Sequence, residues 1–151
     1  MKNDRINVLA ALPGHANALN NLGILLNGQG LHAEALALFD RLVVAAPKEA
    51  RSHANRGVAL KGLGRFADAA QSYQSALSID PRFDTAQNNL GNLYYSQGHF
   101  AQARAHFEGA CTQQHTNTEY RFMLAKCLLE LQQMARAQAE LELVLRHKPT
   151  D

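Results

Sequence analysis

A repeat of 34 residues constrains this chain more than any other feature of its sequence. Pro13, Pro47 and Pro81 lie 34 residues apart, and Pro149 follows two periods after Pro81. Further series with the same period are Gly23, Gly57 and Gly91; Gly30, Gly64 and Gly98; Ala35, Ala69, Ala103 and Ala137; and Phe39, Tyr73, Phe107 and Leu141. A fixed period of about 20–50 residues is typical of stacked structural repeats. The sequence therefore predicts a repeat array.

Each repeat is predicted to form two helices. In the first repeat, leucines between residues 19 and 26 recur every three or four positions, as they do on one face of a helix. Gly30 follows them, and glycine suits the left-handed turn that ends a helix. A second apolar stripe runs over residues 35–42 and ends before Pro47, which cannot continue a helix.

We therefore expect an all-α solenoid of four helix-turn-helix repeats, with eight helices. Small residues such as Gly23 and Ala35 would let the two helices of one repeat approach closely. The fourth repeat is the most divergent, with Ala125, Gln132 and Leu141 in the repeat positions. The predicted boundaries are 16–49, 50–83, 84–117 and 118–151, preceded by a partial repeat or capping helix over residues 1–15.

These residues resemble the tetratricopeptide repeat (TPR) family. The family pattern is present as Leu90, Gly91, Tyr94, Ala103, Phe107 and Ala110, and again as Leu22, Gly23, Leu26, Ala35, Phe39, Leu42 and Pro47. The resemblance covers residues 16–151 and implies a right-handed superhelix whose concave face binds extended peptides. The chain departs from the family where a large aromatic residue is common, at Leu19, His53, Gln87 and Arg121.

Arg56 is a second departure from the pattern, because Leu22, Leu90 and Leu124 occupy the same position in the other repeats. These leucines are expected to face the core. We expect the stem of Arg56 to pack there as well, while its guanidinium group extends toward solvent.

Composition argues against several classes of protein. With 15 basic and 13 acidic residues and no block of either sign, the chain lacks the basic patch of a nucleic-acid or membrane-surface binder. No apolar run approaches the roughly 18 residues of a membrane span. Cys111 and Cys127 are expected to pack as small apolar groups on adjacent helices, with a disulfide left open. We expect a cytoplasmic protein, with the bacterial periplasm as an alternative.

No catalytic motif is recognised, so the sequence predicts a protein that is not an enzyme and needs no cofactor or metal. The glycine-rich stretch 57–64 lacks the Lys-Ser/Thr pair of a phosphate-binding loop. His99 and His106 are seven residues apart, too far to share a zinc ion without further ligands nearby.

The candidate site lies on the first helix of each repeat, opposite its leucine stripe, where asparagines gather. Asn21, Asn55 and Asn89 recur once per repeat. Each amide offers donors and an acceptor, as the backbone of an extended peptide does. Asn21, Asn55 and Asn89 together form an asparagine ladder, which resembles that of the O-linked N-acetylglucosaminyltransferase TPR superhelix. The predicted peptide-binding residues are Asn17, Asn20, Asn21, Arg51, Asn55, Lys61, Asn88, Asn89, Asn92, Tyr95, Met123 and Lys126.

Other interpretations remain open at this point. The asparagines could serve as structural contacts between helices. The positions that would supply the cations of a chaperone-tail clamp hold Asn20, Thr85 and Asn89, or Ala54, Glu119 and Met123 one repeat later, which argues against that ligand. The chain could self-associate through an uncapped end exposing Leu128, Leu141, Val144 and Leu145, or it could be the TPR segment of a larger protein such as a glycosyltransferase.

Overall fold

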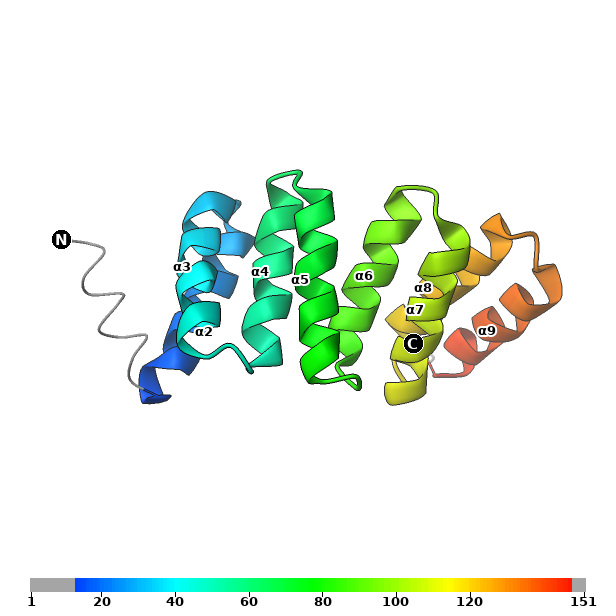
Figure 1. Cartoon of the computed structure of the whole chain (residues 1–151). Coiled ribbons are helices and arrows are strands. Elements are labelled where there is room, and N and C mark those ends of the chain that lie inside the picture. Colours follow the sequence, from blue (N-terminus) through cyan, green and yellow to red (C-terminus); the bar gives the residue numbers. More distant parts are fainter. Residues whose placement is uncertain (1–12, 148–151) are drawn as a thin grey trace. The chain divides into compact units, whose positions relative to one another are not determined.

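The computed structural model describes residues 13–147, which form helices joined by short turns and contain no strand (Figure 1). The helices are α2 (Pro13–Gly28), α3 (His32–Ala45), α4 (Ala50–Gly62), α5 (Phe66–Ile79), α6 (Asp84–Ser96), α7 (Phe100–Gln113), α8 (Thr118–Glu130) and α9 (Met134–His147). The predicted all-α fold of helix pairs is confirmed. Of the predicted N-terminal segment, residues 1–12 lie outside the described part of the chain, and residues 13–15 belong to α2.

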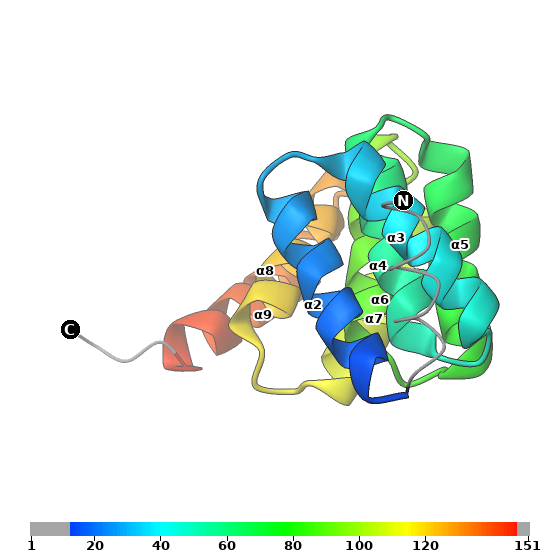
Figure 2. The ribbon, with the colours of Figure 1, turned by 90° about the vertical axis from the view of Figure 1, so that its left-hand side faces the viewer.

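The chain divides after Pro81 into two units, and each is described by itself. Unit 1 contains α2–α5 and unit 2 contains α6–α9. In unit 1, α2 packs on α3 and α4, α3 packs on α4, and α4 packs on α5. Figure 1 shows α4 and α5 side by side, and Figure 2 shows the α2–α3 pair in front of the α4–α5 pair. Unit 2 repeats this scheme, because α6 packs on α7 and α8, α7 on α8, and α8 on α9.

A ring from the second helix of a pair occupies the space beside the glycine of the first. A Cβ atom added to Gly23, Gly57 or Gly91 would lie less than 3.0 Å from the ring of Phe39, Tyr73 or Phe107, respectively. All three rings are almost fully buried. The predicted close approach of the paired helices is therefore confirmed. It is possible because the glycine has no side chain to collide with the aromatic ring of the second helix.

The first helix of every pair ends in the same left-handed turn. Gly30, Gly64 and Gly98 have φ angles of 78°, 75° and 77°, and Gln132 takes the fourth position with φ 58°. After Gln132, the N–H of Gln133 donates to the carbonyl of Leu128 at 2.8 Å, while the N–H of Gln132 donates to the carbonyl of Leu129 at 2.9 Å. This pair of bonds is the Schellman motif. The predicted helix ends are confirmed, and in the last repeat a residue with a side chain adopts the turn.

Replacing Gln132 by glycine is expected to raise the free energy of unfolding by up to about 1 kcal/mol. The left-handed conformation costs a residue with a Cβ atom roughly 1–2 kcal/mol, and the greater chain entropy of unfolded glycine offsets part of that gain. Urea denaturation would measure the change. Gln114→Gly is the matched control, because Gln114 ends α7 with φ −127° and gains no such relief. A loss of stability in Gln132→Gly equal to that of the control would contradict the prediction.

Two predictions about apolar residues are wrong. Leu22 was expected in the core, but it is 45 % exposed, because the described residues include no helix pair before α2 to cover it. Leu128 and Val144 were expected on an exposed end, but both are buried, and Leu128 belongs to the hydrophobic cluster of unit 2. Leu141 is half-buried, whereas Leu145 is 70 % exposed, as expected.

Both cysteines are free and buried, as predicted for small apolar groups, and they form no disulfide. The Sγ atom of Cys127 donates to the carbonyl of Phe100 at 3.0 Å. Burial raises the pKa of the Cys111 thiol to about 11 and also raises the pKa of Cys127. Neither thiol therefore has the thiolate character of a reactive cysteine at neutral pH.

His106 couples the stability of unit 2 to pH. Its ring stacks on that of Tyr94 with centroids 5.5 Å apart, and its Nδ1 donates to the Oε1 atom of Gln87 at 2.8 Å. Burial lowers the pKa of His106 below its ordinary value of 6.5. The unfolded chain therefore binds a proton at this residue more readily than the folded chain does.

We expect the free energy of unfolding to fall as the pH decreases through the unfolded-state pKa of His106, near 6.5, toward its lower folded-state value. The part of this loss that is due to His106 should disappear in His106→Gln. Urea denaturation between pH 7.5 and 5.5 would measure it, with His15→Gln at an exposed position as the matched control. Equal pH dependence in the two variants would contradict the assignment.

Candidate functional site

In unit 1 a buried polar network joins α2 to α4. Asn20 has no exposed surface, and its Nδ2 donates to Ser52 Oγ at 3.1 Å and to Glu49 Oε1 at 3.4 Å. Its Oδ1 accepts from Asn55 Nδ2 at 3.3 Å. Ser52 is also fully buried and donates to Glu49 Oε2 at 3.2 Å. The hydrogen bonds of the Asn20 amide therefore join the helices of unit 1.

The other predicted residues of unit 1 lie at the surface of α2 and α4. The Oδ1 atom of Asn21 accepts from Arg51 Nη2 at 2.7 Å, and both side chains are exposed. Asn55 is half-buried, and within residues 13–147 its Oδ1 atom has no hydrogen-bond donor. Asn17 and Lys61 are exposed. This face of unit 1 thus presents amide groups and two cations.

In unit 2, Asn88 occupies the position that Asn20 has in unit 1, but it lacks the same partners. Asn88 is 8 % exposed, and its Oδ1 atom is buried without a hydrogen bond. Met123 stands where Asn55 stands in unit 1, and Tyr120 stands in place of Ser52. The hydroxyl of Tyr120 donates instead to Asp84 Oδ2 at 2.7 Å. The amide network of unit 1 is therefore not repeated in unit 2.

An aromatic and cationic cluster replaces that network on the surface of α6 and α8. The Nζ atom of Lys126 lies 5.2 Å from the centroid of the Tyr95 ring and 6.0 Å from that of Phe122. The hydroxyl of Tyr95 donates to Glu130 Oε1 at 3.3 Å. Burial, followed by the charge of Glu130, raises the pKa of Tyr95. Phe122 and Leu129 remain 46 % and 43 % exposed.

The remaining predicted residues of unit 2 are all half-buried. Asn89 and Asn92, on α6, form no hydrogen bond through their side chains within the described part of the chain. Met123 packs against the hydrophobic cluster of unit 2. The structure thus leaves two asparagine amides of α6 unpaired, close in sequence to the aromatic and cationic cluster.

A mainly apolar hollow of about 230 Å³ lies between α8 and α9, lined by Thr118, Glu119, Phe122 and Val144. Phe122 contributes both to this hollow and to the contact with Lys126. Sequence reasoning missed the hollow because Val144 comes from a different helix, and the repeat pattern does not show which side chains leave space between helices.

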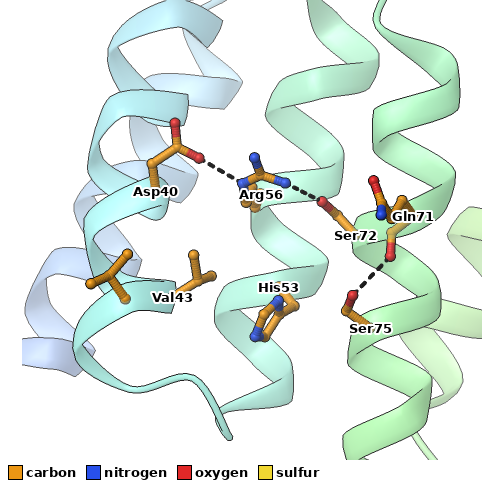
Figure 3. Close-up of a pocket in the computed structure, with 8 residues that line it drawn as sticks. Asp40, Val43, His53, Arg56, Gln71, Ser72 and Ser75 are labelled. Atoms are coloured by element: carbon orange, nitrogen blue, oxygen red, sulfur yellow. Dashed lines mark hydrogen bonds and ion pairs between the residues drawn. The ribbon is translucent and has the colours of Figure 1, made fainter.

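A larger hollow of about 450 Å³ lies in unit 1 among α3, α4 and α5 (Figure 3). Its lining consists of Asp40, Val43, Val44, His53, Arg56, Gln71, Ser72 and Ser75. Arg56 crosses the hollow, and its Nε pairs with Asp40 Oδ1 at 2.6 Å while its Nη1 donates to Ser72 Oγ at 2.7 Å. The guanidinium was expected to extend toward solvent, but it connects α3 with α5 because both helices offer an acceptor beside α4.

Unit 2 has a hollow at the equivalent position, of about 250 Å³. Two ion pairs cross it, from Arg121 Nη1 to Glu140 Oε2 at 2.8 Å and from Arg136 Nη2 to Glu108 Oε1 at 2.9 Å. In both hollows each arginine is thus paired with a carboxylate from another helix. Neither hollow therefore offers a ligand an arginine without a counter-charge.

The stacked helix pairs, with a glycine packed against an aromatic ring and an asparagine-bearing face on the first helices, define a helical-hairpin repeat protein. A family model described as "TPR repeat" matches residues 62–98, and two described as "Tetratricopeptide repeat" match residues 6–50 and 95–151. The chain belongs to the tetratricopeptide repeat family. It is accordingly a module for protein–protein interaction.

Solved structures show the same fold. A crystal structure of MamA is 20 % identical, with a TM-score of 0.80, over 93 % of this chain and 82 % of that one. A thermophilic TPR protein of Thermus thermophilus, TTC0263, is 23 % identical, with a TM-score of 0.78, over 90 % and 75 %. The pilF protein of Pseudomonas aeruginosa is 19 % identical, with a TM-score of 0.79, over 90 % and 62 %. A search of curated protein sequences gives no match.

Within the described residues, no helix combines the length and the apolar character that a membrane span requires. The same residues contain no group of three or more metal-ligating side chains. The proposed likeness of the asparagine ladder to that of O-linked N-acetylglucosaminyltransferases is tested by none of these comparisons and stays a prediction.

Proposed function

We propose that this chain binds an extended segment of a partner protein on the asparagine-bearing face of its first helices, which is the concave face in the family, and that it carries no catalytic activity of its own. The observation that carries the proposal is the pair of unpaired amides on α6, Asn89 and Asn92. A half-buried amide without a protein partner favours a ligand that supplies both a donor and an acceptor, as a peptide backbone does.

In unit 1 the same role falls to exposed and half-buried side chains of α2 and α4. Arg51 is held by Asn21, and Asn55 keeps a free Oδ1 atom. Asn17 and Lys61 extend this polar face. In unit 2, Tyr95, Met123 and Lys126 would select among partner side chains. Asn20 and Asn88 are buried, so in this proposal they act by positioning the helices.

Selection from a library of displayed random dodecapeptides would test the proposal with the full chain as bait. We expect selected peptides to lose most of their affinity for the Asn89→Ala/Asn92→Ala variant. Gln102→Ala/Gln113→Ala is the matched control, because it removes two exposed amides from α7, the other helix of the same pair. Circular dichroism of all three proteins would show that binding is compared between folded chains.

Equal affinity of the selected peptides for both double variants would contradict the role of the α6 amides. Failure to select any peptide, with the chain folded, would contradict the proposal that it captures extended segments.

A further inference from the structure

We infer that α8 of unit 2, together with Tyr95 of α6 and Val144 of α9, binds a partner segment in which a carboxylate side chain lies two residues from a large apolar side chain. This inference rests on the proposed function and names the ligand chemistry for one part of it. The cluster of Lys126, Tyr95 and Phe122 and the hollow beside Phe122 carry the argument.

Lys126 is a cation that two aromatic rings hold in place. Its Nζ atom lies over the rings of Tyr95 and Phe122, at 5.2 and 6.0 Å from their centroids. Within residues 13–147 it forms no ion pair, and the nearby carboxylate of Glu130 accepts from the hydroxyl of Tyr95 instead. Two rings restrict the ammonium group and remove part of its water shell. A ligand carboxylate would therefore meet a cation that is already positioned.

The hollow beside Phe122 supplies the apolar half of the site. Phe122 is 46 % exposed, and the hollow of about 230 Å³ between it and Val144 is open to one large apolar side chain. Leu129, 43 % exposed on the same helix, adds apolar surface beyond Lys126. Apolar surface next to a fixed charge is the usual composition of a side-chain pocket.

Helix geometry sets the spacing of the two ligand groups. Phe122 and Lys126 are four residues apart on α8, a rise of about 6 Å. In an extended peptide, residues i and i+2 point to the same side and lie roughly 6.5 Å apart. The two contacts therefore fit a segment with one residue between its apolar and acidic side chains.

Glu119 determines the orientation in which the ligand would bind. It lines the hollow one turn before Phe122, whereas Lys126 lies one turn after it. A ligand carboxylate would be repelled at Glu119 and attracted at Lys126. In unit 1 the positions equivalent to Tyr95, Phe122 and Lys126 hold Asn27, Ala54 and Val58, so this chemistry belongs to unit 2.

A peptide series would test the inference. The probe is an acetylated and amidated nonapeptide with leucine at position 4, glutamate at position 6 and glycine or serine elsewhere, titrated against the full chain by fluorescence anisotropy. We expect its glutamine analogue to bind wild type about tenfold more weakly. Lys126→Met should bind both peptides with the weaker affinity, because methionine keeps the contact with the rings and removes the charge.

A charge exchange provides the second measurement. Lys126→Glu should reject the glutamate peptide and bind the analogue with lysine at position 6 better than wild type does. Lys48→Met, which removes an exposed lysine from the turn before α4, is the matched control and should bind as wild type does.

The outcomes separate this inference from the proposed function. Equal binding of the glutamate and glutamine peptides, or library peptides that need Asn89 and Asn92 but not Lys126, would overturn only the inference. Concentration-dependent dimers that Lys126→Glu disrupts would also overturn it, because a second copy would then occupy the face. Absence of any peptide binding to the folded chain would overturn the proposed function as well.

Discussion

Gly91→Ala is expected to lower the free energy of unfolding by about 2–3 kcal/mol, an unusually large effect for one methyl group. The added Cβ atom would lie less than 3.0 Å from the ring of Phe107, which is fully buried, so the ring could move aside only by displacing its neighbours in the core. Urea denaturation with linear extrapolation would measure the loss. Gly28→Ala is the matched control, since nothing lies within 4 Å of its Cβ position in α2, and it should be neutral or slightly stabilising.

The fourth repeat shows how the chain accommodates a methyl group at this position. Ala125 replaces the glycine there, and Leu141 replaces the aromatic ring. Combining Gly91→Ala with Phe107→Leu should therefore cost at least about 1 kcal/mol less than the sum of the two single losses. Additive losses would show that the ring does not cause the effect of Gly91→Ala.

The fold could be predicted because the same turn after the first helix recurs in all four helix pairs. A single glycine near a helix end has several explanations. Because Gly30, Gly64 and Gly98 recur at the same repeat position, a left-handed turn is the explanation that they share. Gln132 belongs to the same series by phase alone, and its φ of 58° confirms that position. The repeat spacing therefore predicts the left-handed turn at Gln132, although glutamine itself has little preference for that conformation.

The candidate site was less predictable, because the periodic pattern gives the face of a helix and not the partners across it. Asn20 and Asn21 are adjacent in sequence, yet one is fully buried and the other exposed. The difference arises at α4, where Ser52 and Glu49 meet Asn20 and Arg51 meets Asn21. Likewise, the position of Arg56 depends on acceptors that belong to two other helices, α3 and α5.

This dependence on partners predicts that two asparagines at the same repeat position will respond differently to removal. Asn20→Ala should lower the free energy of unfolding by about 2 kcal/mol, because it removes the only acceptor of the Asn55 amide, leaves the buried Ser52 with Glu49 alone as a partner, and opens a small cavity. Asn88→Ala should cost less than about 1 kcal/mol. Its Oδ1 atom is already buried without a hydrogen bond, so removing it also removes a penalty.

Urea denaturation of the two variants, with the peptide titrations repeated on each, would test this prediction. Equal losses of stability would mean that the asparagine serves the same purpose in both units, and that the hydrogen-bond network of α2 and α4 contributes little. A larger loss for Asn88→Ala would contradict the comparison outright. The expected order follows from two exchanges, Met123 for Asn55 and Tyr120 for Ser52, which together remove both donors to this amide oxygen from unit 2. Met123→Asn, which restores one of these donors, should therefore increase the loss of stability caused by Asn88→Ala.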